Sequence, residues 1–374
     1  MNGNTSQVKK TKRLMNVELL RILSMFFIVC NHFLGHGLGI EDYNFDDPNR
    51  FVLWFFRGLC YTGTNLFVII SAYFQCKSRF RLNGLLQLIY KVLFYSIIIY
   101  FISVLCGLTE FSYSSAVRSF TPIISASYWF ITCYVALCFL APFINSLMSS
   151  LTKEQFKALI LILFVFLSVI PNFFFNSTWL NWGGSCGIVW FVFLYMVAGY
   201  IREYVDIRLI PIRNLLLVLL LFLFLPLITK IIIANLSQIL IGHVVGSSIF
   251  FSNNSVLVFP LSVLIFLTFL KINVSGNGIM KLIAFVSSSI FAVYLISEHP
   301  SISMRLWNFC AQIVEHHFSL IPIFIIVIPI TIMVSCILID QIRKFFFLLI
   351  AKTVIPQKNE GYVSKYISKL FTDL

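Results

Sequence analysis

Ten long apolar stretches dominate this chain and constrain its fold more than any other feature of the sequence. A membrane-spanning helix needs about 20 predominantly apolar residues, and most of the stretches approach or exceed that length. We therefore predict an all-α, polytopic integral membrane helical bundle with about ten transmembrane helices. The stretches lie near residues 17–37, 51–75, 84–107, 127–147, 156–171, 186–201, 212–234, 254–271, 282–301 and 320–348.

Composition excludes a water-soluble enzyme. Only 11% of the 374 residues are charged and 59% are hydrophobic, whereas soluble domains carry roughly 25% charged residues. The stretches leave no room for a large domain outside the membrane, so we predict a transmembrane domain over 1–350 and a short basic cytoplasmic tail over 351–374. Nine cysteines without a C-x-x-C pair favour neither a disulfide framework nor a metal site.

The positive charges alternate with the predicted topology. Of the 27 Lys and Arg residues, twenty fall in segments on the side of the N-terminus, three fall on the opposite side and four fall within the stretches. Because basic residues concentrate in cytoplasmic loops, both termini are predicted to be cytoplasmic in a multi-pass protein of the plasma membrane. The net charge of +13 is thereby explained without a nucleic-acid partner.

The first stretch carries two ionisable residues with a regular spacing. Arg21 and His32 are eleven residues apart, which in a helix is a rise of about 16 Å and close to three turns, so both lie on one face. Ionisable groups are costly in a bilayer and mark functional sites by default. The alternatives are that Arg21 only extends to the interface and that a neighbouring helix satisfies His32.

Four segments resemble acyltransferase family 3, a family of integral membrane proteins. The family's hallmark is an Arg or Lys, ten residues and then a His in the first span, which Arg21 and His32 match within NVELLRILSMFFIVCNHF. The segments NLFVIISAYF (65–74), SYWFITCYVALCFLAPFIN (127–145) and FAVYLISEHP (291–300) are similar to later family segments and occur in the family's order. Ala72 departs from the pattern because the family has Gly there.

The resemblance implies a membrane O-acyltransferase, most simply an O-acetyltransferase. Such a protein would move an acetyl group from cytoplasmic acetyl-CoA, a donor substrate rather than a permanently bound cofactor, to a cell-surface or lipid-linked carbohydrate. Bacterial capsular or exopolysaccharide is the leading acceptor class. The chain has no room for the soluble esterase-type domain of some members, so any further transfer step would need a separate extracytoplasmic partner.

The resemblance also suggests roles for polar residues. His32 would act as a general base on the acceptor hydroxyl or as a transient acyl carrier, and basic side chains would bind CoA phosphates. Two residues could orient the imidazole, and four could contact the acyl group or sugar, although interfacial anchoring of aromatic rings and helix–helix hydrogen bonds are equally open for these four. The basic residues are Arg21, Arg79, Arg81 and Lys91, the orienting pair is Glu298 and His299, and the four contact residues are Tyr128, Trp129, Asn31 and Asn145.

Counting along two spans predicts one contact of the site. His32 lies about 14 residues beyond Glu18, and Glu298 lies about 16 residues beyond Leu282, so a constant helical rise brings them to similar depth. We therefore expect Glu298 or His299 near His32, where a carboxylate would orient the ring and stabilise imidazolium.

Two other function classes remain open at this stage. A polysaccharide or small-molecule transporter or flippase would also place charges inside the membrane, but transporters often contain internal repeats, and we find none in this sequence. A membrane protein without turnover would tolerate substitution of Arg21 and His32.

Overall fold

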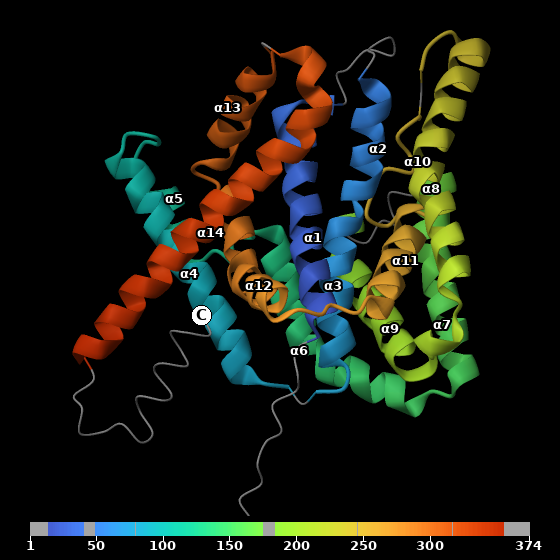
Figure 1. Ribbon diagram of the computed structural model, residues 1–374, viewed down its shortest axis with the longest axis horizontal. Coiled ribbons are helices and arrows are strands. Elements are labelled where there is room, and N and C mark those ends of the chain that lie inside the picture. The colour runs from blue at the N-terminus through green and yellow to red at the C-terminus, as the bar shows by residue number, and fades with distance from the viewer. Residues whose placement is uncertain are drawn as a thin grey trace, which may run out of the picture.

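A computed structural model describes residues 14–40, 49–78, 80–174, 184–244, 246–315 and 317–354, and every regular element in these ranges is helical. The all-α prediction is confirmed, and each of the ten apolar stretches contains a helix (Figure 1). The α-helices are α1 (Met15–His32), α2 (Arg50–Cys60), α3 (Thr62–Gln75), α4 (Leu82–Leu105), α5 (Tyr113–Phe120), α6 (Trp129–Ser150), α7 (Lys153–Phe164), α8 (Ile170–Phe173), α9 (Ile188–Tyr204), α10 (Ile212–Ile241), α11 (Val258–Lys271), α12 (Asn277–Ser297), α13 (Ser303–Glu315) and α14 (Ile321–Val354).

The lengths and hydropathy of the helices indicate a multi-pass membrane protein. Within the described ranges, eight helical segments are long and apolar enough to cross a bilayer. The helices of the two remaining stretches, α9 and α11, are shorter, with 17 and 14 residues. The helix α14 continues to Val354, past the predicted end of the membrane domain at 350, and the rest of the predicted tail lies outside the described residues.

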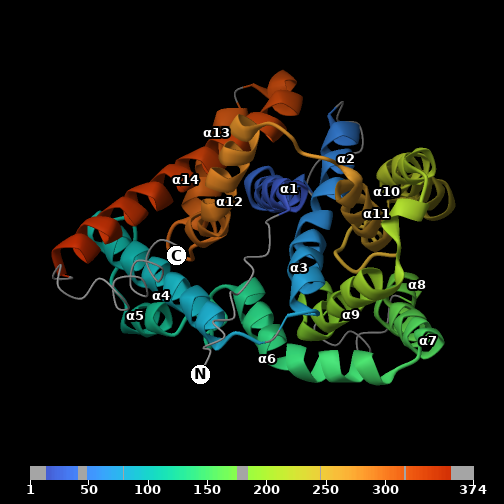
Figure 2. The ribbon, with the colours of Figure 1, turned by 60° about the horizontal axis from the view of Figure 1, so that its bottom comes forward.

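The helix α1 occupies the centre of the bundle. It packs against α3 and α12 most extensively and also contacts α2, α11 and α14, which surround it in Figure 2. An apolar window of 18 residues in the segment formed by α2 and α3 is 72% buried, whereas the corresponding window of α10 is only 6% buried. The apolar side chains of α10 therefore face the lipid, whereas α1 is surrounded by other helices.

Close packing of α1 against α3 depends on Gly63. A Cβ atom at this position would lie 2.8 Å from the carbonyl oxygen of Ser24 and 3.0 Å from the backbone nitrogen of Ile28. Small residues allow helix backbones to approach closely in membranes. Gly63 thus fixes the distance between the two helices on which much of the site is built.

The backbone before α11 is not helical, although the apolar stretch was predicted to begin at 254. Asn65 donates from Nδ2 to the carbonyl oxygen of Asn253 at 2.7 Å, and Asn172 Oδ1 accepts from the Val256 N–H at 2.9 Å. Asn and Ser side chains compete with helical hydrogen bonds, and irregular backbone inside a membrane protein requires such partners. The helix consequently begins at Val258.

The helix α12 ends before Glu298, so Glu298 and His299 lie in a turn and not in a span extending to 301 as predicted. Pro300 explains this difference, because a residue that precedes proline is disfavoured in the α conformation. The turn leads directly into α13, which packs on the π-helical end of the first span, Phe33–Gly37.

Candidate functional site

Glu298 contacts His32 inside the bundle. The Nδ1 atom of His32 lies 3.2 Å from Oε2 of Glu298, and the side chains are 19% and 13% exposed. The structure therefore places the carboxylate where counting along the two spans predicted it. A neutral imidazole that donates from Nδ1 to a carboxylate keeps Nε2 as the basic nitrogen.

Trp307 holds the other oxygen of the same carboxylate. Its indole Nε1–H donates to Glu298 Oε1 over 3.1 Å, and the Trp307 side chain, from α13, is fully buried. The His32 ring lies nearly parallel to Trp307, with 6.3 Å between ring centroids, and to His36, with 5.5 Å. These contacts fix both the carboxylate and the plane of the imidazole.

His299 does not share this arrangement. Its Nδ1 accepts a hydrogen bond from the Ser301 N–H at 3.1 Å, so Nε2 carries the proton and donates to the carbonyl oxygen of Ser96 at 3.1 Å. Nε2 thus joins the turn to α4, and Nδ1 is used within the turn itself. This geometry suits His299 to holding the turn that presents Glu298.

A guanidinium reaches the His32 helix where it changes to a π-helix. Arg57 Nη1 donates to the backbone oxygen of Asn31 at 2.7 Å and to its side-chain Oδ1 at 2.9 Å. Gly35 makes room, because a Cβ there would lie 2.9 Å from the same Nη1. Single π turns in helices occur frequently at functional sites. Asn31 is therefore held by Arg57 beside His32.

Arg21 lies at the other end of α1 in an ion pair within the helix. Its Nη1 is 2.8 Å from Oε2 of Glu18, and the Arg21 side chain is 27% exposed. The pair uses one of the terminal nitrogens, and a guanidinium has five N–H donors in all. Arg21 is thus oriented by Glu18 and retains donors for an anionic ligand.

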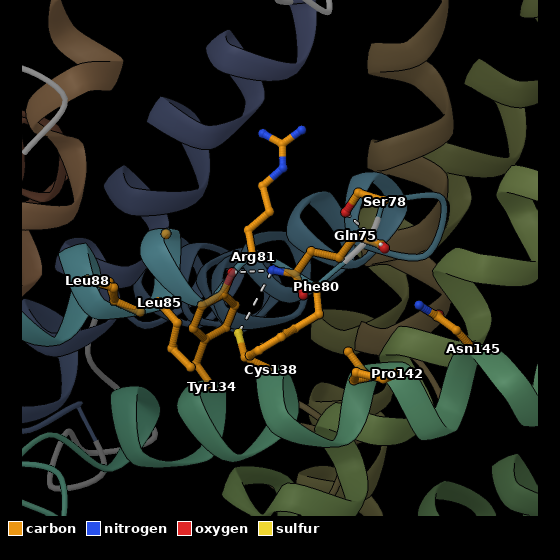
Figure 3. Close-up of a pocket in the computed structure, with 12 residues that line it drawn as sticks. Gln75, Ser78, Phe80, Arg81, Leu85, Leu88, Tyr134, Cys138, Pro142 and Asn145 are labelled. Carbon is orange, nitrogen blue, oxygen red and sulfur yellow. Dashed lines mark hydrogen bonds between the residues drawn. The ribbon is translucent and has the colours of Figure 1, made fainter. Parts of the chain in front are cut away.

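A cavity of about 590 Å³ opens between α3, α4 and α6 at the end of the bundle that contains Arg81 (Figure 3). Its size is within the usual range of ligand sites. Gln75 donates from Nε2 to the Tyr134 hydroxyl at 2.7 Å in this cavity. In Figure 3 the Arg81 side chain extends away from these two residues. The cavity combines apolar walls with a cationic group at its edge.

Three further candidates, Asn145, Tyr128 and Trp129, lie in different parts of the bundle. Asn145 lines this cavity, but its Oδ1 accepts from the Tyr195 hydroxyl at 2.9 Å. Tyr128 is buried and donates to the carbonyl oxygen of Leu295 at 3.0 Å. Trp129 lines a second, much smaller cavity together with His32. Arg79 lies outside the described residues.

Lys91 is held in a buried ion cluster between α4 and α14. Its Nζ lies 3.8 Å from Oδ1 of Asp340, which is fully buried and also contacts Arg343 at 2.9 Å and Lys344 at 3.2 Å. Tyr95 donates its hydroxyl to Asp340 at 2.6 Å. Lys91 does not line the 590 Å³ cavity, so this geometry gives it a role in helix packing.

Comparison with known proteins decides the family. A family model of acyltransferase family 3, described as an acyltransferase domain, matches residues 15–340. The chain belongs to acyltransferase family 3. Searches of curated proteins and of solved structures gave no match. The matched range includes α1, the turn containing Glu298, and Asp340, whereas Arg343 and Lys344 of the ion cluster lie just beyond it.

In this acyltransferase, the sequence did not single out two groups that the structure places at the site. Trp307 comes from α13, a short amphipathic helix of 13 residues, and its only sequence signal is a tryptophan between Leu306 and Asn308. Arg57 is one of the four basic residues within the apolar stretches, and the sequence does not assign it a partner. Across the described residues, no three His, Cys, Asp or Glu side chains are grouped as metal ligands.

Proposed function

We propose that this membrane acyltransferase is an O-acetyltransferase that moves an acetyl group from acetyl-CoA to a hydroxyl of a cell-surface carbohydrate across the plasma membrane. The observation that carries the proposal is the contact between His32 Nδ1 and Glu298 Oε2 at 3.2 Å. An imidazole that is oriented by a buried carboxylate is suited to taking a proton from a hydroxyl.

The donor reaches His32 from the Arg81 end of the bundle. The helices α3 and α6 both line the 590 Å³ cavity, through Gln75 and Tyr134, and both line the small cavity at His32, through Phe67 and Phe130. Residues at i, i+4 and i+8 share a helix face, so these two helices form a continuous wall. The acyl thioester arm lies along this wall, and Arg21 and Arg81 bind its phosphates.

The reaction balances with His32 as the proton carrier. Nε2 accepts the proton of the carbohydrate hydroxyl while the oxygen attacks the thioester carbonyl, and the C–S bond then breaks. The departing thiolate takes the proton from imidazolium, which yields the acetyl ester and CoA. In the alternative order, Nε2 attacks the thioester carbonyl and the C–S bond breaks, which gives an acyl-imidazolium and CoA thiolate. The carbohydrate hydroxyl then attacks the acyl carbonyl, His32 leaves as neutral imidazole, and the hydroxyl proton passes to the thiolate. Glu298 stabilises the imidazolium in both orders.

The experiment is complementation of a deletion strain at matched membrane levels of protein. Proton NMR measures the O-acetyl content of surface polysaccharide from cells that carry wild type, His32→Ala or the control His243→Ala, which changes an exposed histidine after α10. We expect acetyl signals from wild type and His243→Ala only. Equal signals from His32→Ala would contradict the role of His32, and unchanged polysaccharide acetylation on deletion would contradict the acceptor class.

A flippase is separated from this proposal by the fate of the donor. A transferase releases one CoA for each acetyl ester formed, whereas a flippase moves carbohydrate without consuming acetyl-CoA. Measuring free CoA thiol against ester in membranes of the same strains therefore distinguishes the two functions.

A further inference from the structure

The cavity at His32 is small and almost entirely apolar. It measures about 20 Å³, and side chains from α1, α3, α6 and α12 enclose it. Besides His32, the side chains used in the argument below are Met25, Ile28, Phe67, Phe130 and Tyr294. Each of these five is at most 8% exposed. The space beside His32 is thus a small chamber whose other lining residues, His32, Thr64, Trp129 and Phe291, are partly exposed. None of its lining residues lines the larger cavity.

The volume permits only a small group. One water-sized sphere needs roughly 10–15 Å³ by this kind of measure, so the chamber accommodates one or two such groups. An acetyl group presents a methyl group and a carbonyl oxygen next to its reacting carbon and fits this space. Each further methylene of a longer acyl chain would need volume that the chamber lacks.

Aromatic packing prevents the chamber from expanding easily. The Phe130 ring meets Phe67 edge-on with 5.8 Å between centroids and meets Tyr294 at 5.9 Å. It also lies parallel to Tyr134 at 6.1 Å, on the side of the larger cavity. Close-packed interiors resist added volume. Phe130 therefore lies between Tyr134 of the donor cavity and the chamber, and Phe67 lines the chamber from α3.

We infer that Phe67 and Phe130 set the acyl-chain length of this transferase and limit it to two carbons. The inference rests on the proposed function, because it concerns the acyl group that His32 receives. It adds a physical cause for acetyl selectivity and names the residues that determine it.

The test uses membranes from a strain of the source organism in which the gene for this protein is deleted. The strain expresses the recombinant full-length protein. Radiolabelled acetyl-, propionyl- and butyryl-CoA are supplied separately, and base-labile label in carbohydrate is measured for each. One methylene in an apolar pocket changes kcat/KM by about 10- to 200-fold. We expect wild type to prefer acetyl to butyryl by at least that factor.

Variants of the two rings test whether they determine the selectivity for acetyl over butyryl transfer. In Phe67→Ala the ratio of butyryl to acetyl transfer should rise at least about tenfold, and Phe130→Leu should raise it in the same direction. The matched control is Phe156→Ala, which removes an equally buried ring that packs on Tyr200 and Tyr204 away from the chamber. Its ratio should equal that of wild type.

The outcomes separate the inference from the proposed function. Wild type that uses butyryl as well as acetyl would overturn the inference without any variant. Unchanged ratios in folded Phe67→Ala and Phe130→Leu would overturn the assignment to these two rings. Absence of transfer from all three donors by wild type would overturn the proposed function itself.

Discussion

The indole N–H of Trp307 donates a hydrogen bond to Glu298 Oε1 over 3.1 Å, and the second oxygen of Glu298 contacts His32. The helix α13 is thus coupled to the first span through one carboxylate. A hydrogen bond to a charged group contributes about 1.5–3 kcal/mol, so the indole favours the ionised form of Glu298.

Removing this donor should change the pH dependence of transfer. In Trp307→Phe the ionised carboxylate loses a partner, so we expect the acid limb of the pH–rate profile to move to higher pH and kcat to fall about tenfold or more. The matched control is Trp190→Phe, which removes an indole donor from Asn65. The control should lower stability but leave the profile in place, and an unmoved profile in Trp307→Phe would contradict the role of the indole.

Arg81 should contribute to the binding of acetyl-CoA and not to the rate of acetyl transfer. Arg81→Ala is expected to raise the KM for acetyl-CoA about tenfold with little change in kcat, because it removes a charge at the edge of the donor cavity. The effect should shrink at high salt, which screens exposed charges. Arg208→Ala serves as the control, since the Arg208 side chain is 87% exposed and pairs with Asp206. A KM equal to that of wild type would place the phosphates elsewhere.

Gly63→Ala should destabilise the bundle. The added Cβ would lie within 2.8–3.0 Å of α1 backbone atoms, which cannot move as a side chain can, and overpacking costs about 1–3 kcal/mol. The control is Gly278→Ala, where no atom lies within 4 Å of the added Cβ. Thermal unfolding in detergent should give a lower Tm for Gly63→Ala alone. Equal Tm values would show that α1 and α3 are not closely packed there.

Asp340→Asn should destabilise the protein more strongly than Gly63→Ala. Removal of one partner from a buried ion pair costs about 3–5 kcal/mol, because the remaining charge is left uncompensated. We expect Lys91→Met in the same chain to restore part of the loss. The measurement is Tm of the two single variants and the double variant, with Glu154→Gln, an exposed change on α7, as control. If Lys91→Met adds to the damage, Lys91 does not pair with Asp340.

The contact between His32 and Glu298 was predictable because helices rise by a constant 1.5 Å per residue through a slab of fixed thickness. Counting residues from one face therefore gives depth, and depth brought these two residues together. The same reasoning could not choose between Glu298 and His299. That choice depends on the turn before Pro300, in which His299 is directed to the backbone of α4.

The sequence could not predict which helices lie next to one another in the bundle, and therefore which side chains meet. Lys91 contacts Asp340 on α14 because the order of the helices around α1 brings α4 next to α14. Arg57 reaches Asn31 because the helix changes to a π-helix and Gly35 leaves space. Neither feature has a signal in apolar periodicity. Trp307 was missed for the same reason, since the packing of α13 and not its sequence pattern directs the indole to Glu298.

The most direct test of the account is a double-mutant cycle on kcat/KM for acetyl transfer, using His32→Ala, Glu298→Gln and the double variant at equal membrane levels. Residues that act as one catalytic unit are strongly non-additive. The account predicts a loss of about 10⁴-fold in Glu298→Gln, as for the carboxylate of a catalytic triad. It also predicts a double variant no less active than His32→Ala. Independent, multiplying losses, or wild-type transfer by His32→Ala, would contradict it.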